Sequence, residues 1–396
     1  MRQNTSSPQR PKRVGIIVNE VSGDQLAAAL IEALRDRSPD LVFEGMTGPL
    51  MEAEGCRSLA VMDPVMGLIE VLGHLPALLK TRRRLIDHFL DDPPDLVLGV
   101  DAPDFNLALE TRLKAAGITT AHFVSPTVWA WRQGRVKKLR RAVDLMLCIF
   151  DFEVAFLERH QVPAVYVGHP MADQIPLEPR DPESVRLELG LDEKKPVVAL
   201  LPGSRMSEVS RLGEPFLRTA AWLKQRRPEL QFVAPMVSQS IKQAFEEQMQ
   251  RVSPELSVVL LDAQPRQAVS AADVVLTASG TATLETLLLK KPMVVAYRLA
   301  GLTAWLIRRF NLLKTPYVAI ANLLSERMLA PEFLQEACRA ETMGQALLDF
   351  LDNPQRREEV AQRYLEIHRQ LRRDSANRAA EAILKLLEPN RSGFAE

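Results

Sequence analysis

AADVVLTASGTATLETLLLKKPMVVAY, residues 271–297, indicates a strand, a glycine turn, a helix and a second strand. Residues 273–278 are mostly apolar and rich in β-branched side chains, as in a buried parallel strand, and residues 281–290 carry the leucines of an amphipathic helix. Ser279, Gly280 and Thr281 form the turn. A helix that begins there directs free backbone N–H groups beyond the strand, and glycine lets a phosphate approach closely. We therefore predict an anion site at this turn.

Glu285 extends this prediction from an anion to a nucleotide. It follows Thr281 by four residues and so shares its helix face. A carboxylate there can accept two hydrogen bonds from a ribose diol. The alternative is a capped helix with a surface glutamate, because a Ser-Gly-Thr turn followed by one acid is a weak signal alone.

The composition is that of a globular protein of two or three domains, with 396 residues, 46% of them hydrophobic and 25% charged. Lys plus Arg and Asp plus Glu are 50 each, so we expect no general nucleic-acid binder. The three cysteines lack the spacing of a disulfide framework or a metal site, which favours a reducing cytoplasm. We expect a loose tail over residues 1–13 and no signal peptide. No apolar run reaches the roughly 20 residues of a spanning helix, so we expect a soluble or surface-bound protein.

The first half of the chain alternates strand-like and helical segments, which predicts a parallel sheet covered on both faces. The expected strands are residues 14–18, 41–46, 95–100, 119–124, 145–150 and 164–167. After the first strand, Glu20, Ser22 and Gly23 lead into a helix expected from near Gln25. A Ser-Gly pair at a helix start can hold a phosphate or a sugar hydroxyl, or act as an ordinary cap.

Residues 65–79 interrupt this alternation with a helical apolar stripe that ends in basic residues. Such a segment suits an anionic membrane surface, although it can equally pack on the sheet. The candidate membrane contacts are Val65, Met66, Leu68, Ile69, Leu72, Leu75, Arg82, Arg83 and Arg84.

Polar residues follow the next two strands. Asp101, Asp104 and Asn106 come just after the third strand, and ligands of α/β sheets bind at such carboxyl ends. Asp101 is a candidate general base, whereas Asp104 and Asn106 are also suited to cap the next helix. The strand after that leads to residues that suit a polar ligand with apolar groups, or plain packing. They are His122, Ser125, Trp129, Trp131 and Arg132.

Residues 174–186 are rich in proline and acidic side chains and are expected to be an inter-domain linker. A second alternation follows, with strands expected at residues 197–201, 230–233, 257–261, 273–278 and 293–297. Gly203, Ser204 and Arg205 come directly after its first strand. Glycine permits close approach and Arg205 offers a fixed fork to a diphosphate, although an exposed turn arginine is usually solvated. The chain is then expected to be helical to its end.

The order of these segments resembles one family. The matching segments are SGD (22–24), VMGLIEVLGHLP (65–76), GVDAPDFN (99–106), VSPTVWAWRQGRV (124–136), GHPMAD (168–173), LLPGSR (200–205), ASGTATLE (278–285), PMVVAYR (292–298) and NLL (322–324). Together they resemble the lipid-A-disaccharide synthases, from about Val14 to the last helix. Asn19 departs from the glycine that usually opens the family's first loop.

This resemblance implies a GT-B fold of the α/β class, with two Rossmann-like domains facing across a cleft and a helical C-terminal extension. It divides the chain into a tail (1–13), an acceptor-side domain (14–175), a UDP-sugar domain (176–354) and terminal helices (355–396) that pack back or are exchanged in a homodimer. Asp101 and Arg205 are the implied catalytic residues. The implied donor site comprises Ser22, Gly23, Gly203, Ser204, Arg205, Ser279, Gly280, Thr281, Glu285 and Asn322. The implied acceptor cleft comprises Glu20, Asp104, Asn106, His122, Ser125, Trp129, Trp131 and Arg132.

The implied reaction is an inverting transfer from UDP-2,3-diacylglucosamine to the 6-hydroxyl of 2,3-diacylglucosamine 1-phosphate (lipid X), which gives lipid A disaccharide 1-phosphate and UDP. No metal or other cofactor is implied. The implied location is the cytoplasmic face of the inner membrane of a Gram-negative bacterium. Two alternatives remain open, a UDP-N-acetylglucosamine epimerase of the same fold and a non-catalytic membrane-surface binder of nucleotide sugars.

Overall fold

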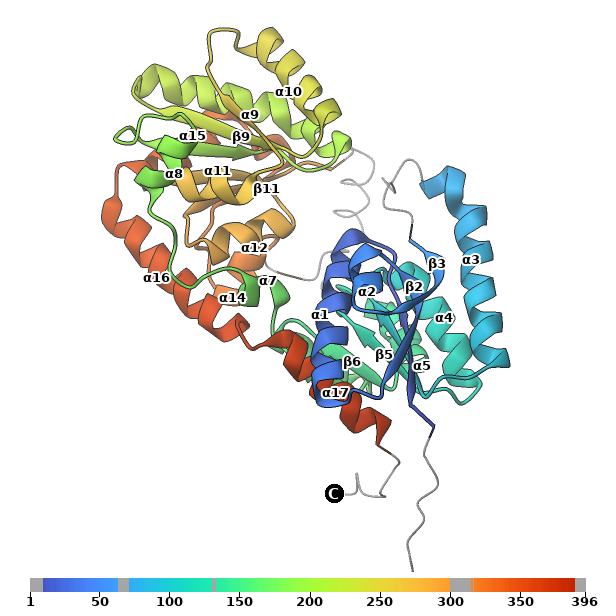
Figure 1. The fold of residues 1–396 in the computed structure, drawn as a ribbon. Helices are drawn as coiled ribbons and strands as arrows, with labels where there is room; N and C mark the ends of the chain where they lie inside the picture. Colours follow the sequence, from blue (N-terminus) through green and yellow to red (C-terminus); the bar gives the residue numbers. More distant parts are fainter. Residues whose placement is uncertain (1–9, 63–70, 130–132, 300–314, 316, 389–396) are drawn as a thin grey trace, which may run out of the picture. The chain divides into compact units, whose positions relative to one another are not determined.

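The computed structural model describes residues 10–62, 71–129, 133–299, 315 and 317–388, and they form two compact units (Figure 1). The first contains the chain up to Asp173 and again from Leu371, and the second contains Gln174–Gln370. Among the described residues no helix is long and apolar enough to cross a membrane.

The first unit is built on a seven-stranded parallel sheet with the strand order β3-β2-β1-β4-β5-β6-β7. The strands are β1 (Arg13–Ile17), β2 (Val42–Thr47), β3 (Arg57–Val61), β4 (Leu96–Val100), β5 (Thr120–Phe123), β6 (Leu145–Cys148) and β7 (Ala164–Tyr166). The α-helices are α1 (Val21–Arg37), α2 (Pro49–Ala53), α3 (Val71–Asp91), α4 (Pro103–Ala115), α5 (Val136–Ala142), α6 (Asp151–Arg159), α7 (Pro170–Gln174) and α17 (Ser375–Leu387). Helix α1 packs against α2 and α17, and α4 packs against α3 and α5 on the other face (Figure 1).

Helix α17 belongs to the core of this first unit although it comes from the end of the chain. Its buried residues Ala379, Ala380, Ile383 and Leu387 join the same apolar cluster as the buried side of α1. The backbone N–H groups of residues 373–375 donate to the carboxylate of Asp173. Within the chain, the last helix therefore completes the unit that contains the first strand.

The second unit contains a six-stranded parallel sheet with the order β10-β9-β8-β11-β12-β13. The strands are β8 (Val197–Leu201), β9 (Gln231–Met236), β10 (Val259–Asp262), β11 (Val274–Ala278), β12 (Met293–Tyr297) and β13 (Glu332–Leu334). The helices are α8 (Pro182–Glu188), α9 (Met206–Arg226), α10 (Gln239–Val252), α11 (Pro265–Ala271), α12 (Thr281–Leu288), α14 (Ile320–Ser325), α15 (Ala340–Leu351) and α16 (Pro354–Leu371). Helix α9 packs against α10 and α15, and α11 packs against α8 and α12.

Both sheets have a point at which the chain order reverses, between β1 and β4 and between β8 and β11. In open α/β sheets, ligands usually bind at the carboxyl ends of the strands beside such a reversal point. All four strands are mostly apolar and largely buried, so the sheet fixes where each following loop begins.

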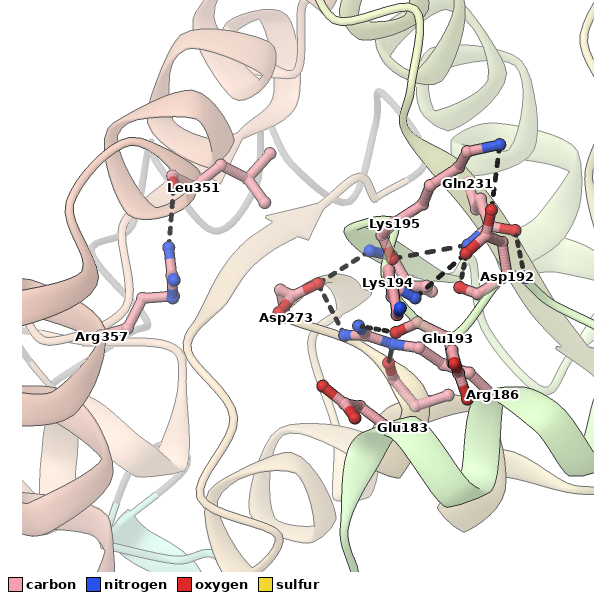
Figure 2. Close-up of polar contacts among 12 residues, drawn as sticks. Glu183, Arg186, Asp192, Glu193, Lys194, Lys195, Gln231, Asp273, Leu351 and Arg357 are labelled. Atoms are coloured by element: carbon pink, nitrogen blue, oxygen red, sulfur yellow. Dashed lines mark hydrogen bonds and ion pairs between the residues drawn. The ribbon is translucent and has the colours of Figure 1, made fainter.

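The segment expected to be a linker is in part a structural element of the second unit. Arg186 on α8 is buried, and its guanidinium donates to Asp273 Oδ2 at 2.8 Å, Glu193 O at 3.0 Å and Ala271 O at 2.9 Å (Figure 2). Asp273 also accepts from the backbone N–H of Val197 at 2.8 Å. These contacts join α8 to the amino-terminal edge of the sheet, so the sequence-based linker was wrong in its second half.

Three other expectations differ from the structure. Strands β3 and β13 were not predicted, since both lie at sheet edges and only partly exclude solvent. Helix α1 begins at Val21 rather than near Gln25, so Ser22 and Gly23 lie in its first turn. Helix α3 continues to Asp91 through the basic run, whereas a helix that ends at residue 79 was expected; residues 65–70 of that expectation lie outside the described residues.

Candidate active site

Asp101 stands directly after β4 in a strained backbone conformation. Its φ is 51° and that of Ala102 is 42°, both in the left-handed region that residues with a Cβ rarely occupy. Asp101 Oδ1 accepts from the N–H of Ala102 at 2.9 Å, and among the described residues Oδ2 has no hydrogen-bond partner. Backbone strain of this kind persists only where neighbouring contacts enforce it, and it concentrates at functional sites.

Asn106 on α4 supplies such contacts. Its side chain is fully buried, and Nδ2 donates to Asp101 O at 2.8 Å, with longer contacts to Val100 O at 3.3 Å and Ile17 O at 3.4 Å. Ile17 ends β1 and Val100 ends β4, so Asn106 links the two strands on either side of the reversal point. It does not cap α4, whose N-cap position is Ala102. Asn106 therefore stabilises the loop that carries Asp101 through hydrogen bonds from the buried side.

The loop after β1 reaches the same edge of the sheet. Glu20 is the N-cap residue of α1 and is exposed, as is Ser22, whereas Gly23 is buried. The adjacent Asp24 has a structural task, because its buried carboxylate accepts from the N–H groups of Leu50 and Met51 at 3.0 Å each, at the start of α2. Glu20 and Ser22 thus present polar groups beside the carboxyl end of β4, which pairs with β1.

The residue after β5, the strand next to β4, also has a strained backbone conformation. Val124 has a φ of 78°, which is an outlier for a β-branched residue. Ser125 follows it and is buried. His122, expected at the acceptor cleft, instead lies within the unit, where Nδ1 is 2.7 Å from Glu110 Oε1 and neither side chain is exposed. This burial also argues against His122 as a general base in place of Asp101, because an acceptor hydroxyl would have to enter the core.

Trp129 lies beyond β5 and contacts residues that follow β6. Its indole donates to Glu153 Oε1 at 3.2 Å, and its ring packs edge-on against Phe152 with 4.8 Å between centroids. Burial raises the pKa of Glu153 to about 8. Asp104 is exposed and paired with Arg135 at 2.7 Å. Trp131 and Arg132 lie outside the described residues.

In the second unit, β8 ends in the glycine turn predicted as a diphosphate site. Gly203 has a φ of 127°, and a Cβ there would lie 2.5 Å from Glu208 Oε2, so glycine is needed for both reasons. Glu208 Oε2 accepts from the N–H groups of Ser204 at 2.9 Å and Arg205 at 3.2 Å, and Oε1 from the Arg205 side chain at 3.2 Å. A carboxylate therefore occupies this helix start, while the Arg205 side chain remains 63% exposed.

The turn after β11 is open by comparison. Gly280 has a φ of 142° and precedes α12 with no side-chain cap. In the described part of the chain, the N–H groups of Thr281 and Ala282 have no hydrogen-bond partner and can meet an anion, whereas that of Thr283 donates to Gly280 O. Ser279 is half-buried. Because β8 and β11 are paired, with Leu201 opposite Thr277, the two glycine turns leave the sheet side by side. One turn along α12, Glu285 Oε1 accepts from Arg266 Nε at 2.9 Å.

Asn322, expected at the donor site, uses all its polar atoms inside the second unit. Nδ2 donates to Ala330 O at 2.7 Å and Glu332 Oε1 at 2.8 Å, and Oδ1 accepts from the N–H groups of Leu329 and Ala330 at 2.8 and 2.9 Å. The residue is fully buried. An amide has two donors and one oxygen, and here none is left for a ligand. Binding of the donor by Asn322 therefore stays a prediction, and these contacts argue against it.

The predicted membrane stripe can be placed only in part. Val65, Met66, Leu68 and Ile69 lie outside the described residues, and for Leu72 and Leu75 only the backbone, at the start of α3, is described. Arg83 and Arg84 are exposed, whereas Arg82 stacks over the ring of Phe105 at 5.9 Å. Among the described residues no group of three His, Cys, Asp or Glu side chains is placed to hold a metal ion.

Two functional candidates were missed by sequence reasoning. Arg266 is separated from Glu285 by 19 residues and a strand, so no local pattern links them. Glu208 follows Arg205 by three residues, which is the spacing of a capping box and could have revealed its contact with the turn.

Comparison with known proteins identifies the chain. Residues 14–387 match the family model described as lipid-A-disaccharide synthetase. The lipid-A-disaccharide synthase of Hahella chejuensis is 47% identical over 389 residues, with 98% of this chain and 97% of the relative covered. That of Pseudomonas syringae pv. syringae is 50% identical over 379 residues, covering 95% and 98%.

Solved structures share the fold at low identity. The UDP-GlcNAc 2-epimerase of Neisseria meningitidis, bound to UDP-GlcNAc, has a TM-score of 0.61 at 12% identity and covers 94% of this chain and 100% of its own. A glycosyltransferase of Rickettsia africae has a TM-score of 0.58 at 10% identity, covering 96% and 100%. These neighbours confirm the GT-B fold class, and the far closer sequence relatives disfavour the epimerase alternative. The chain is therefore an enzyme that belongs to the lipid-A-disaccharide synthetase family, the glycosyltransferases of lipid A biosynthesis.

Proposed function

We propose that the chain transfers the diacylglucosaminyl group of UDP-2,3-diacylglucosamine to the 6-hydroxyl of lipid X, releasing UDP and lipid A disaccharide 1-phosphate. The observation that carries this proposal is the family match over residues 14–387, which includes every motif at the carboxyl ends of β4, β5, β8 and β11.

The donor binds to the second unit in this proposal. The diphosphate lies at the free N–H groups that follow Gly280 and beside the exposed guanidinium of Arg205. The ribose diol donates to Glu285, whose carboxylate is one turn along the same helix. Arg205 and the positive end of the α12 dipole then stabilise the negative charge that develops on the departing UDP.

Asp101 is the proposed general base for the acceptor. Its free Oδ2 accepts the proton of the 6-hydroxyl while that oxygen forms a bond to the anomeric carbon of the donor. The bond between the anomeric carbon and the diphosphate oxygen breaks, and its electron pair leaves with UDP. Attack opposite the leaving group inverts the configuration. The enforced backbone of Asp101 and Ala102 supports this role, because it fixes where the carboxylate points.

The test is the release of UDP from UDP-2,3-diacylglucosamine with and without lipid X, with the disaccharide product identified by mass spectrometry. Asp101→Asn keeps the size of the side chain but removes the base. We expect kcat to fall by at least about a hundredfold, with unchanged UDP affinity by calorimetry. A near-normal kcat would remove Asp101 from the chemistry, and UDP release independent of lipid X would contradict the proposed transfer.

We also propose that α3 and the residues before it contact the cytoplasmic face of the inner membrane, where both lipid substrates reside. Leu79 is 44% exposed, and Lys80, Arg83 and Arg84 are exposed close to it. Anionic lipid attracts such a basic segment. Charge reversal of Arg83 and Arg84 to Glu should release the protein from anionic vesicles, whereas the same change at the exposed Lys137 and Lys138 on α5 should not. Homodimer formation through terminal helices remains a further proposal from the resemblance.

A further inference from the structure

Arg266 on α11 contacts the carboxylate proposed to bind ribose. Its Nε lies 2.9 Å from Glu285 Oε1, and α11 packs directly against α12, both labelled in Figure 1. The Arg266 side chain is 48% exposed, but that of Glu285 is only 13% exposed. Arg266 thus approaches from the solvent side, and the Glu285 carboxylate that it contacts is largely enclosed.

The remaining atoms of this pair are available. In the described part of the chain, Glu285 Oε2 has no hydrogen-bond or ion-pair partner, and the guanidinium of Arg266 contacts no other carboxylate. One carboxylate oxygen is therefore held while the other is open. An ion pair with a half-exposed arginine contributes little to folding stability, so stabilisation of the fold does not account for this contact.

We propose that Arg266 is a positioning residue for the donor, which fixes Glu285 so that the carboxylate accepts the hydroxyls of a ribose diol. The ligand class is a nucleoside diphosphate with an intact ribose. This inference rests on the proposed donor site. Without Arg266, the Glu285 side chain regains its rotamers, and binding of the diol must then order it again.

The experiment compares UDP with 2′-deoxy-UDP by calorimetry on the full chain, because the second ligand lacks one of the two hydroxyls. The wild-type protein should bind UDP more tightly than 2′-deoxy-UDP. Arg266→Ala should weaken UDP binding roughly tenfold, the scale of one charged hydrogen bond, and 2′-deoxy-UDP binding much less. Arg266→Lys should restore part of the difference. In turnover assays, the donor KM should rise with little change in kcat.

Arg251→Ala is the matched control, because Arg251 is also an exposed arginine of this unit, 3.3 Å from Glu214. It should leave both affinities unchanged. Unaltered UDP affinity in Arg266→Ala would overturn the inference, and so would an equal loss for both ligands, which would mean that Arg266 acts on the diphosphate directly. If the wild-type protein bound no UDP, the donor site itself would fall, so the two failures are distinguishable.

Discussion

Replacement of Asn106 by alanine should separate the folding of the first unit from the placement of Asp101. The change removes the 2.8 Å hydrogen bond to Asp101 O and the two longer contacts to Val100 O and Ile17 O. A buried carbonyl left without its partner costs about 1–3 kcal/mol. Among the residues that the structure describes, Asn106 Oδ1 has no partner although it is buried, and its removal offsets part of this loss. We therefore expect the free energy of unfolding to fall by about 1–2 kcal/mol.

The effect on activity should be larger than the effect on stability. Left-handed backbone at two successive non-glycine residues costs on the order of 1–3 kcal/mol for each, and Asn106 is one of the contacts that enforce it. Once released, the loop relaxes and the carboxylate of Asp101 moves away from its position.

The assay combines urea unfolding with kcat and UDP affinity on the same protein. We expect kcat to fall at least about tenfold while UDP affinity, which the proposed donor site assigns to the second unit, is unchanged. Thr111→Ala is the control on the same helix, since the Thr111 hydroxyl donates within α4, to Leu107 O at 2.6 Å, and makes no other side-chain hydrogen bond to a described residue. If Asn106→Ala were destabilised as expected but kept normal kcat, Asp101 would not depend on this loop geometry.

Three further changes test other parts of the structure. Asn322→Ala should lower the free energy of unfolding by about 2 kcal/mol or more in denaturant titration, since it leaves the buried C=O and N–H of Ala330 without their partner; a loss of UDP binding with normal stability would instead restore it to the donor site. Burial raises the pKa of Glu153 to about 8, above its ordinary value of 4.5, so between these values the folded state binds more protons than the unfolded state. The free energy of unfolding should therefore fall as pH rises from 4.5 to 8. Glu153→Gln should flatten that dependence in melts across this range, and an unchanged slope would refute the assignment. Ile383→Ala should cost about 2–5 kcal/mol in thermal or urea unfolding, because its side chain is fully buried in the apolar cluster where α17 meets the rest of the first unit; a loss under 1 kcal/mol would mean that α17 is loosely held.

Central strands could be predicted closely from the sequence. β8 and β12 have the expected bounds, because a strand buried on both faces is a continuous apolar run. β3 and β13 have mixed polarity at sheet edges and carry no such signal. Length and periodicity also could not place the end of α3, because the helix continues beyond residue 79 to Asp91 through a basic run.

In the candidate site, the glycine turns were predictable from the sequence, whereas the hydrogen-bond partners of the polar side chains were not. Gly203 and Gly280 follow strands and were identified by position, and both have the positive φ that glycine tolerates. Asn322 illustrates the opposite case, since a polar residue among apolar ones fits either a ligand contact or a buried structural contact, and its four hydrogen bonds, which favour the second, could not be predicted from the sequence. Similarly, the contact between Arg266 and Glu285 depends on which helices are neighbours, which is a property of the sheet order.

The position of α17 affects how the protein is made on the ribosome. The first unit keeps the α17-facing side of α1 uncovered until residues 375–387 emerge, after all of residues 174–370. At about 5–20 residues per second, that interval lasts roughly 10–40 s, long compared with the collapse of a small domain. During translation the nascent chain therefore displays an apolar helix face that a chaperone can hold. Ribosome-bound chains stopped at residue 373 should remain protease-sensitive in α1, and chains stopped well beyond residue 396 by an added C-terminal extension should not.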